Sequence, residues 1–282
     1  MHMDIRLLGA LEVTLNGVGV TPTAPKPRQL LALLALHAGQ VVPVGTLTEE
    51  LWAGRPPRTA RTTLQTYVLQ LRELIAVALE KDPLAADDGV PRTTKDVLVT
   101  APGGYLLDSA NGTFDVRELD RLSGLGYRAM DAGDFPGAAR HLREAMALWT
   151  GSAFADVQIG PQLEMEAKRL EETRLCVLDQ RIEAELRLGR HRDLLAELTV
   201  LVNRYPIHEN LHGQYMLALH RSGRRGEALE AYQRLRATLV REMGLEPSAE
   251  LRRVQQMILM AGPEGVFMPA ADTRRASLAR SV

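Results

Sequence analysis

Residues 59–75 read TARTTLQTYVLQLRELI, and this stretch decides how the N-terminal part of the chain is interpreted. Leu64, Val68, Leu71 and Ile75 follow one another at steps of three or four residues, the spacing of one face of an α-helix. The opposite face is polar and consists of Arg61, Thr62, Gln65, Thr66, Gln70, Arg72 and Glu73. Such a helix fits the major groove of DNA, but it is also typical of an ordinary helix with a solvated face. The helix alone leaves both interpretations open.

The residues before this helix predict a small α+β region. The first twenty residues alternate between apolar and polar positions and contain Asn16-Gly17, a pair typical of hairpin turns. Two or three short antiparallel strands are therefore expected. Two helices should follow, from about Arg28 to Ala38 and from about Val44 to Trp52. Thr46 and Glu49 have the spacing of a capping box at the start of the second helix.

The residues after the long helix predict a β-hairpin. Residues 82–96 are polar and loop-like, and the apolar runs 97–100 and 105–107 follow, separated by Ala101-Pro-Gly-Gly104. Strands, three helices and a hairpin in this order are typical of a winged helix-turn-helix. In that fold the third helix is the recognition helix and the hairpin is the wing. The order of elements thus favours DNA binding over a merely solvated helix.

Charge supports DNA binding only locally. The formal net charge of the chain is −1, and residues 1–110 contain ten Lys and Arg against eleven Asp and Glu. Residues 55–72, however, contain four Arg and no acidic residue. The positive charge is therefore concentrated around the start of the predicted recognition helix, where it can neutralise phosphates. On the predicted wing, the residues expected to reach phosphates or the minor groove are Arg92, Lys95 and Thr100. Lys26 and Arg28 are either phosphate contacts or ordinary surface charges.

The C-terminal half predicts an all-α repeat domain. Similar units begin at Gly133-Asp-Phe, Gly189-Arg-His and Gly223-Arg-Arg, and the second and third begin 34 residues apart (223 − 189), the tetratricopeptide period. The alternative is a generic helical bundle with repeated glycine turns. The predicted fold is therefore mainly α, with a winged helix-turn-helix over residues 1–110 and a tetratricopeptide-like domain over 111–262. Residues 263–282 lack periodicity and are predicted to form a disordered tail.

The sequence offers little for catalysis, cofactor binding or membrane insertion. It lacks the Gly-rich phosphate loop of nucleotide-binding proteins, it has a single cysteine, Cys176, and its histidines are scattered. His208 and His212 are four residues apart but have no acidic partner in a zinc-type motif. The longest apolar run, Leu30 to Leu36, is far shorter than the ~20 residues of a membrane span. We expect a cytoplasmic, nucleoid-associated protein that is not an enzyme and binds no cofactor or metal.

Several stretches carry a resemblance to a known family. They are Lys26-Pro-Arg-Gln-Leu-Leu, Thr63-Leu-Gln-Thr-Tyr-Val, Gly103-Gly-Tyr, Ala147-Leu-Trp-Thr-Gly, Arg221-Ser-Gly-Arg and Leu245-Glu-Pro-Ser. Together they make residues 3–260 similar to the Streptomyces antibiotic regulatory proteins, which combine an OmpR-type winged helix with a bacterial transcriptional activation domain. The resemblance implies binding to double-stranded promoter DNA at direct repeats, as a dimer of two protomers side by side. It further implies recruitment of RNA polymerase holoenzyme through its sigma-factor region, at genes of antibiotic or other secondary-metabolite biosynthesis.

The resemblance also implies roles for individual residues. Thr66 and Gln70 would face bases, whereas Thr62, Thr63 and Arg72 would face phosphate. The turn from Trp52 to Arg58 would touch polymerase, with Trp52, Arg55 and Arg58 as the contacts. One departure concerns the wing, where Thr100-Ala-Pro stands in place of an Arg common in OmpR-type wings. The main alternative function is a tetratricopeptide-type scaffold that binds proteins and has no specific affinity for DNA.

Overall fold

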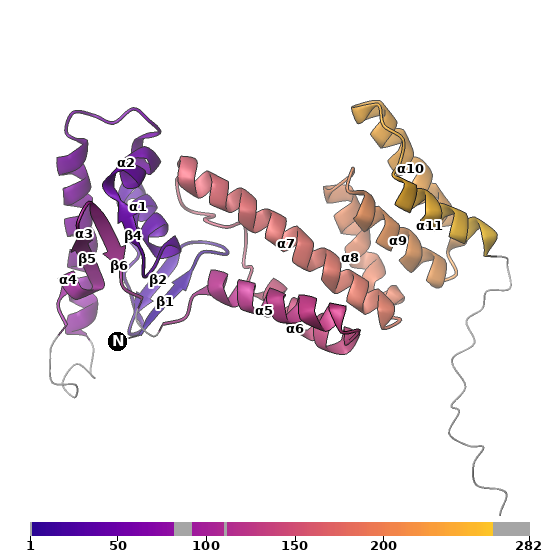
Figure 1. Ribbon diagram of the computed structural model, residues 1–282, viewed down its shortest axis with the longest axis horizontal. Helices are drawn as coiled ribbons and strands as arrows, with labels where there is room; N and C mark the ends of the chain where they lie inside the picture. The colour runs from indigo at the N-terminus through magenta and orange to yellow at the C-terminus, as the bar shows by residue number, and fades with distance from the viewer. Residues whose placement is uncertain (1, 82–91, 110–111, 262–282) are drawn as a thin grey trace, which may run out of the picture. The chain divides into compact units, whose positions relative to one another are not determined.

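The structure, a computed structural model, describes residues 2–81, 92–109 and 112–261 (Figure 1). It is mainly helical with small sheets near the N-terminus, as the sequence predicts. The chain forms two compact units, Met1–Ala184 and Glu185–Val282, and each is considered by itself. The first unit thus contains the predicted winged helix together with the helices that follow it. The predicted tail at 263–282 lies outside the described residues.

The first sheet is the antiparallel set β1 (Met3–Arg6), β2 (Glu12–Leu15) and β3 (Val18–Gly19). In its register Met3 pairs with Leu15 and Ile5 with Val13, and all four side chains are fully buried. The alternation in the sequence therefore places one face of the sheet on the core. The predicted turn between β2 and β3 is present, with Asn16 and Gly17 both at positive φ (51° and 80°).

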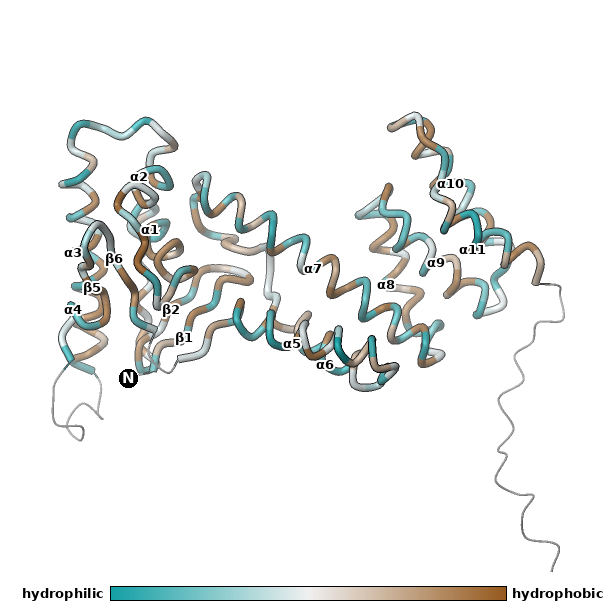
Figure 2. Tube along the Cα trace, viewed as in Figure 1, coloured by the Kyte–Doolittle hydropathy of each residue, from teal (hydrophilic) through white to brown (hydrophobic). Residues whose placement is uncertain are grey.

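Three helices follow: α1 (Pro25–Leu36), α2 (Val44–Trp52) and α3 (Ala60–Glu80). The apolar run of α1, coloured as hydrophobic in Figure 2, is almost entirely buried. This helix starts three residues before the predicted Arg28, because a proline in the first turn loses no hydrogen bond. The capping box predicted for α2 is wrong. Pro43 precedes the helix and Thr46 lies inside its first turn.

A second sheet, in the order β4-β6-β5, carries the wing. It consists of β4 (Val41–Pro43), β5 (Leu98–Ala101) and β6 (Gly104–Leu107), so the predicted hairpin is present. A Cβ on Gly104 would lie 2.3 Å from the carbonyl oxygen of Val42, so only glycine lets β4 approach β6 here. The sequence predicted that the loop continues to residue 96, and this is wrong for its last residues. The short helix α4 (Thr94–Val97) forms there, capped by Thr93 and Asp96.

Among the remaining helices, some connections are turns at the glycines that mark the sequence repeat. In the first unit, α5 (Asp115–Asp131) and α6 (Phe135–Ala147) meet at Gly133, and α7 (Pro161–Arg187) begins after a loop. The second unit contains α8 (His191–Arg204), α9 (Glu209–Arg221), α10 (Arg225–Met243) and α11 (Ala249–Met260). Gly133, Gly189 and Gly223, in the connections α5–α6, α7–α8 and α9–α10, all have positive φ between 74° and 83°, the conformation that favours glycine at a helix end.

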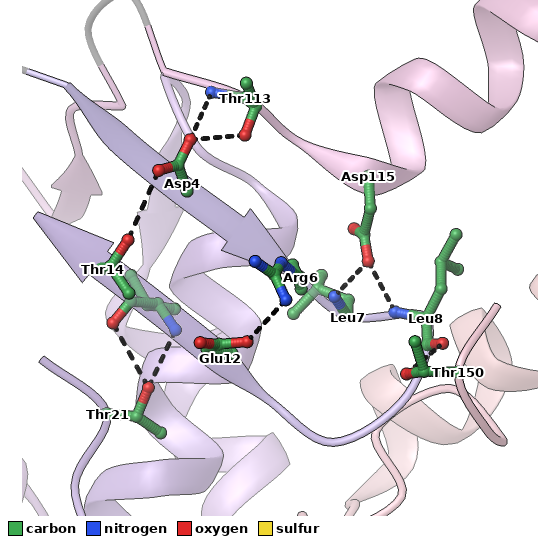
Figure 3. A network of polar contacts seen from close by, with 11 residues as sticks. Asp4, Arg6, Leu7, Leu8, Glu12, Thr14, Thr21, Thr113, Asp115 and Thr150 are labelled. Carbon is green, nitrogen blue, oxygen red and sulfur yellow. Dashed lines mark hydrogen bonds and ion pairs between the residues drawn. The ribbon is translucent and has the colours of Figure 1, made fainter. Parts of the chain in front are cut away.

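Within the first unit, hydrogen bonds join the β1–β2 loop to Asp115 at the start of α5 and to the loop between α6 and α7 (Figure 3). The N–H groups of Leu7 and Leu8 donate to Oδ2 of Asp115 at 2.7 and 2.8 Å. The N–H of Thr150 donates to the carbonyl oxygen of Leu8 at 2.9 Å, and that of Phe154 donates to the carbonyl oxygen of Leu7 at 3.0 Å. Burial raises the pKa of Asp115, although the Leu8 and Leu7 N–H groups oppose this. The winged helix and the helices that follow it are therefore packed together within the first unit.

Candidate nucleic-acid interface

The two faces of α3 differ as the sequence predicts. Leu64, Val68, Leu71 and Ile75 are buried against the domain. On the outer side, Arg61, Thr62, Thr66 and Gln70 are exposed, and Thr63 is half-buried. The Thr66 hydroxyl donates to the carbonyl oxygen of Thr62 at 3.1 Å, which leaves its oxygen lone pairs directed to solvent. The outer face therefore offers hydroxyl, amide and guanidinium groups on a single rigid helix.

Leu69 interrupts this polar face, a feature not predicted from the sequence. Its side chain is 56% exposed, although leucine is usually buried. Gln65 and Glu73, four residues before and after it, are exposed as well. The exposure of Leu69 could have been predicted from the helical spacing, because Leu69 lies outside the series of residues that forms the buried face.

Arg72 connects the helix to the wing. Its Nε and Nη2 donate to the carbonyl oxygen of Leu98 at 3.2 and 2.7 Å, and Nη2 also donates to Oγ1 of Thr100 at 2.8 Å. The guanidinium therefore fixes β5 beside α3. A phosphate contact by Arg72 stays a prediction, but the half-buried side chain already has this structural role.

The other predicted wing residues lie at the surface. Lys95 and Thr100 are exposed, and Thr100, whose oxygen accepts from Arg72, still has its hydroxyl proton to donate. Arg92 is exposed and lies 3.5 Å from a carboxylate oxygen of Asp108. The structure brings Thr100 next to α3 through Arg72, and the short helix α4, which carries Lys95, also packs against α3.

Lys26 and Arg28 have partners within the first unit. Nζ of Lys26 donates to the carbonyl oxygen of Leu51 at 2.7 Å and to Oε1 of Gln29 at 3.0 Å. Arg28 forms an ion pair with Asp156 at 2.9 Å. These contacts favour a structural role over the phosphate contacts considered from the sequence.

The turn between α2 and α3 is compact and exposes its charges. Ala53 and Gly54 both have positive φ (48° and 78°), which ends α2 abruptly. Arg55 and Arg58 are exposed, and Trp52 is half-buried. The three residues predicted to contact polymerase therefore lie on one short, sharply bent segment directly before α3.

Glu50 is a buried residue that sequence reasoning missed. Its side chain is 1% exposed, and its carboxylate accepts from the N–H groups of Gly160, Gln162 and Leu163 at 2.6 to 3.1 Å. It also accepts from Nε2 of Gln29 at 2.9 Å. The carboxylate of α2 thus caps the N-terminus of α7. Two adjacent glutamates at the end of an amphipathic helix gave no local signal for this, because that pattern is usually solvated.

Within the described ranges, no helix is long and apolar enough to cross a membrane. In the same part of the chain, no three or more His, Cys, Asp or Glu side chains are grouped to hold a metal ion.

Comparison with known proteins agrees with this architecture. Residues 114–259 match the family model of the bacterial transcriptional activator domain, and residues 20–86 match that of the C-terminal domain of transcriptional regulatory proteins. The regulatory protein DnrI of Streptomyces peucetius is 51% identical over 95% of this chain and 98% of its own length. The regulatory protein AfsR of Streptomyces coelicolor is 34% identical over 96% of this chain and 26% of its own length.

A solved structure is similar as well. Mycobacterium tuberculosis EmbR, in complex with a low-affinity phosphopeptide, has a TM-score of 0.81 and 33% sequence identity. The similarity covers 92% of this chain and 65% of the EmbR chain.

Proposed function

Since the chain belongs to the Streptomyces antibiotic regulatory protein family of transcriptional activators, we propose that it binds direct repeats upstream of promoters through α3. The observation that carries this proposal is the outer face of α3, where Thr62, Thr66 and Gln70 are exposed on a helix that Arg72 ties to the wing. Amide and hydroxyl groups read base edges, while the exposed Arg61 and Lys95 neutralise phosphates. Two protomers bind side by side, one on each repeat.

The proposal extends to transcription itself. The bound protein recruits RNA polymerase holoenzyme, through the sigma-factor region, by way of Trp52, Arg55 and Arg58. It does so in the cytoplasm, on the nucleoid, at genes for antibiotic or other secondary-metabolite biosynthesis. Support comes from the place of these three residues, on a sharp turn whose two arginines are exposed beside the DNA-facing helix.

Binding of the full chain to duplex DNA tests the first part. We expect a sequence selected from random duplexes to bind with an affinity that falls steeply as salt rises. Gln70→Ala should relax the preference at one base-pair position, at a cost of about 1–3 kcal/mol, whereas Arg61→Ala should weaken all sequences alike. Arg72→Ala is unsuitable as the phosphate variant, because it also removes the hydrogen bonds to Leu98 and Thr100. Equal affinity for every duplex would contradict the proposal and favour the protein-binding scaffold.

Run-off transcription on the selected promoter tests the second part. The double variant Arg55→Ala/Arg58→Ala should bind the promoter with at least half the wild-type affinity and lose most of the activation. The reason is that both side chains are exposed and lie outside the α3 face that meets the bases. Lys168→Ala is a matched surface control, since Lys168 is an exposed helical residue whose ammonium pairs with Glu164 in its own helix. Full activation by the double variant would show that this turn does not recruit polymerase.

A further inference from the structure

Leu69 lies near the middle of the α3 face that the proposed function directs at DNA. Its side chain is 56% exposed. It lies two positions from the buried Leu71, a rotation of about 200° around the helix, and therefore points away from the core. The residues one turn away on this face, Gln65, Thr66 and Glu73, are polar and exposed. A single large apolar side chain is thus presented among hydrogen-bonding groups.

The chemistry of the major groove offers one apolar feature on the base edges. This is the C5-methyl group of thymine, since the other exposed groups of the four base pairs there are hydrogen-bond donors and acceptors. A leucine placed against a hydrogen-bond donor or acceptor of a base would exclude water from that group without offering it a new hydrogen bond, which costs free energy. A leucine against the methyl group buries apolar surface on both sides.

Glu73 indicates that this side of α3 meets bases and not the phosphate backbone. It is exposed and follows Leu69 by four residues, about 6 Å along the helix axis. A carboxylate against a phosphate is repulsive, whereas on the groove floor it can accept from the N4 amino group of cytosine. The charges proposed to neutralise phosphates lie elsewhere, at Arg61 near the start of α3 and at Lys95 on α4.

We propose that Leu69 is a specificity-determining residue that reads the methyl group of one thymine in each repeat. This inference rests on the proposed function, because it assumes that α3 enters the major groove. It assigns Leu69 a role distinct from that of Gln70. Gln70 selects a base by hydrogen bonds, and Leu69 selects thymine over the other bases by a methyl contact.

Deoxyuridine scanning tests this inference. The full chain is first used to select a duplex site from random sequence, and each thymine of that site is then replaced by deoxyuridine, which removes only the methyl group. For the wild-type chain, one such replacement per repeat should weaken binding about fourfold, the effect of one methyl group removed from an apolar contact. The Leu69→Ala variant should bind the thymine and deoxyuridine sites equally. Because Leu69 is exposed, this variant should keep the melting temperature of the wild-type chain.

Val77→Ala is the matched control. Val77 is an exposed apolar residue of the same helix, 47% exposed and two turns nearer its C-terminal end, so its variant should retain the loss on deoxyuridine. If no deoxyuridine weakens wild-type binding, or if Leu69→Ala shows the same loss, the inference is overturned although DNA binding stands. A loss of cooperativity between repeats without any deoxyuridine effect would also overturn it and assign Leu69 to a contact between protomers. If the wild-type chain selects no sequence, the proposed function itself fails, and Leu69 has no base to read.

Discussion

Replacing Glu50 by alanine is expected to destabilise the first unit by about 3–5 kcal/mol. The substitution removes the acceptor of four hydrogen bonds, from the N–H groups of Gly160, Gln162 and Leu163 and from Nε2 of Gln29. The Leu163 and Gln29 donors are buried, so each would lose a partner that water does not readily replace. Urea unfolding of the full chain measures the loss, and hydrogen exchange should show lost protection of the amides at 160–163.

Glu49→Ala is the matched control for this experiment. Glu49 precedes Glu50 in the same helix, but it is exposed, and its carboxylate accepts from the half-buried side chain of Gln162. We expect it to change the free energy of unfolding by no more than about 0.5 kcal/mol. Glu50→Gln should change the free energy of unfolding by an amount between those of the two alanine variants. Its carboxamide oxygen still accepts a hydrogen bond, but its NH₂ group faces other donors. Equal stability of Glu50→Ala and Glu49→Ala would show that Glu50 does not hold α7.

The Glu50 contacts also concern the proposed function. They attach α2, the helix before the turn at Trp52–Arg58, to the first turn of α7. Together with the contacts of Asp115 and Thr150 on the β1–β2 loop, they make the winged helix continuous with the helices that follow. Loosening this attachment should therefore lower activation more than it lowers affinity for DNA.

Acidification is expected to destabilise the second unit through His212. Burial lowers the pKa of this imidazole to about 4; nearby His208 and Arg234 add to the effect, and the backbone at Val202 and Tyr205 opposes it. In the unfolded chain the same group titrates near 6.5. The folded state therefore favours neutral His212, so stability is full above pH 6.5 and falls as the pH decreases toward 4. The total loss is on the order of 3 kcal/mol.

The pH dependence of urea unfolding, followed by far-UV circular dichroism, measures this loss. His212→Leu should remove most of the decrease between pH 6.5 and 4, because leucine keeps an apolar group in the buried position of α9. His220→Gln is the control, since burial also lowers the pKa of His220 but its side chain is only half-buried. It should remove a small part of the decrease. An unchanged pH profile in His212→Leu would contradict the assignment.

Some features of this protein are local and were predictable from the sequence. The buried face of α3 follows from the spacing of Leu64, Val68, Leu71 and Ile75, because helical geometry places such residues on one side whatever surrounds them. The hairpin turn at Asn16-Gly17 and the helix ends at Gly189 and Gly223 follow from backbone conformations that few other residues adopt. The family resemblance rests on such local patterns, and the comparisons confirm it.

The tertiary structure decided what depends on partners distant in the sequence. From the sequence alone, Glu50 would be interpreted as a solvated charge; only the folded structure places Gly160–Leu163 against it. Arg72 would be interpreted as a phosphate contact, and only the folded structure shows that it binds β5 beside α3. Strand β4, three residues long, forms because β6 offers it a partner 61 or more positions later in the sequence (104 − 43). The sequence determined which face of α3 is turned outward. Only the fold decided which groups on and around that face are bound within the protein and which, like Leu69 and Gln70, stay exposed for the proposed contacts with DNA.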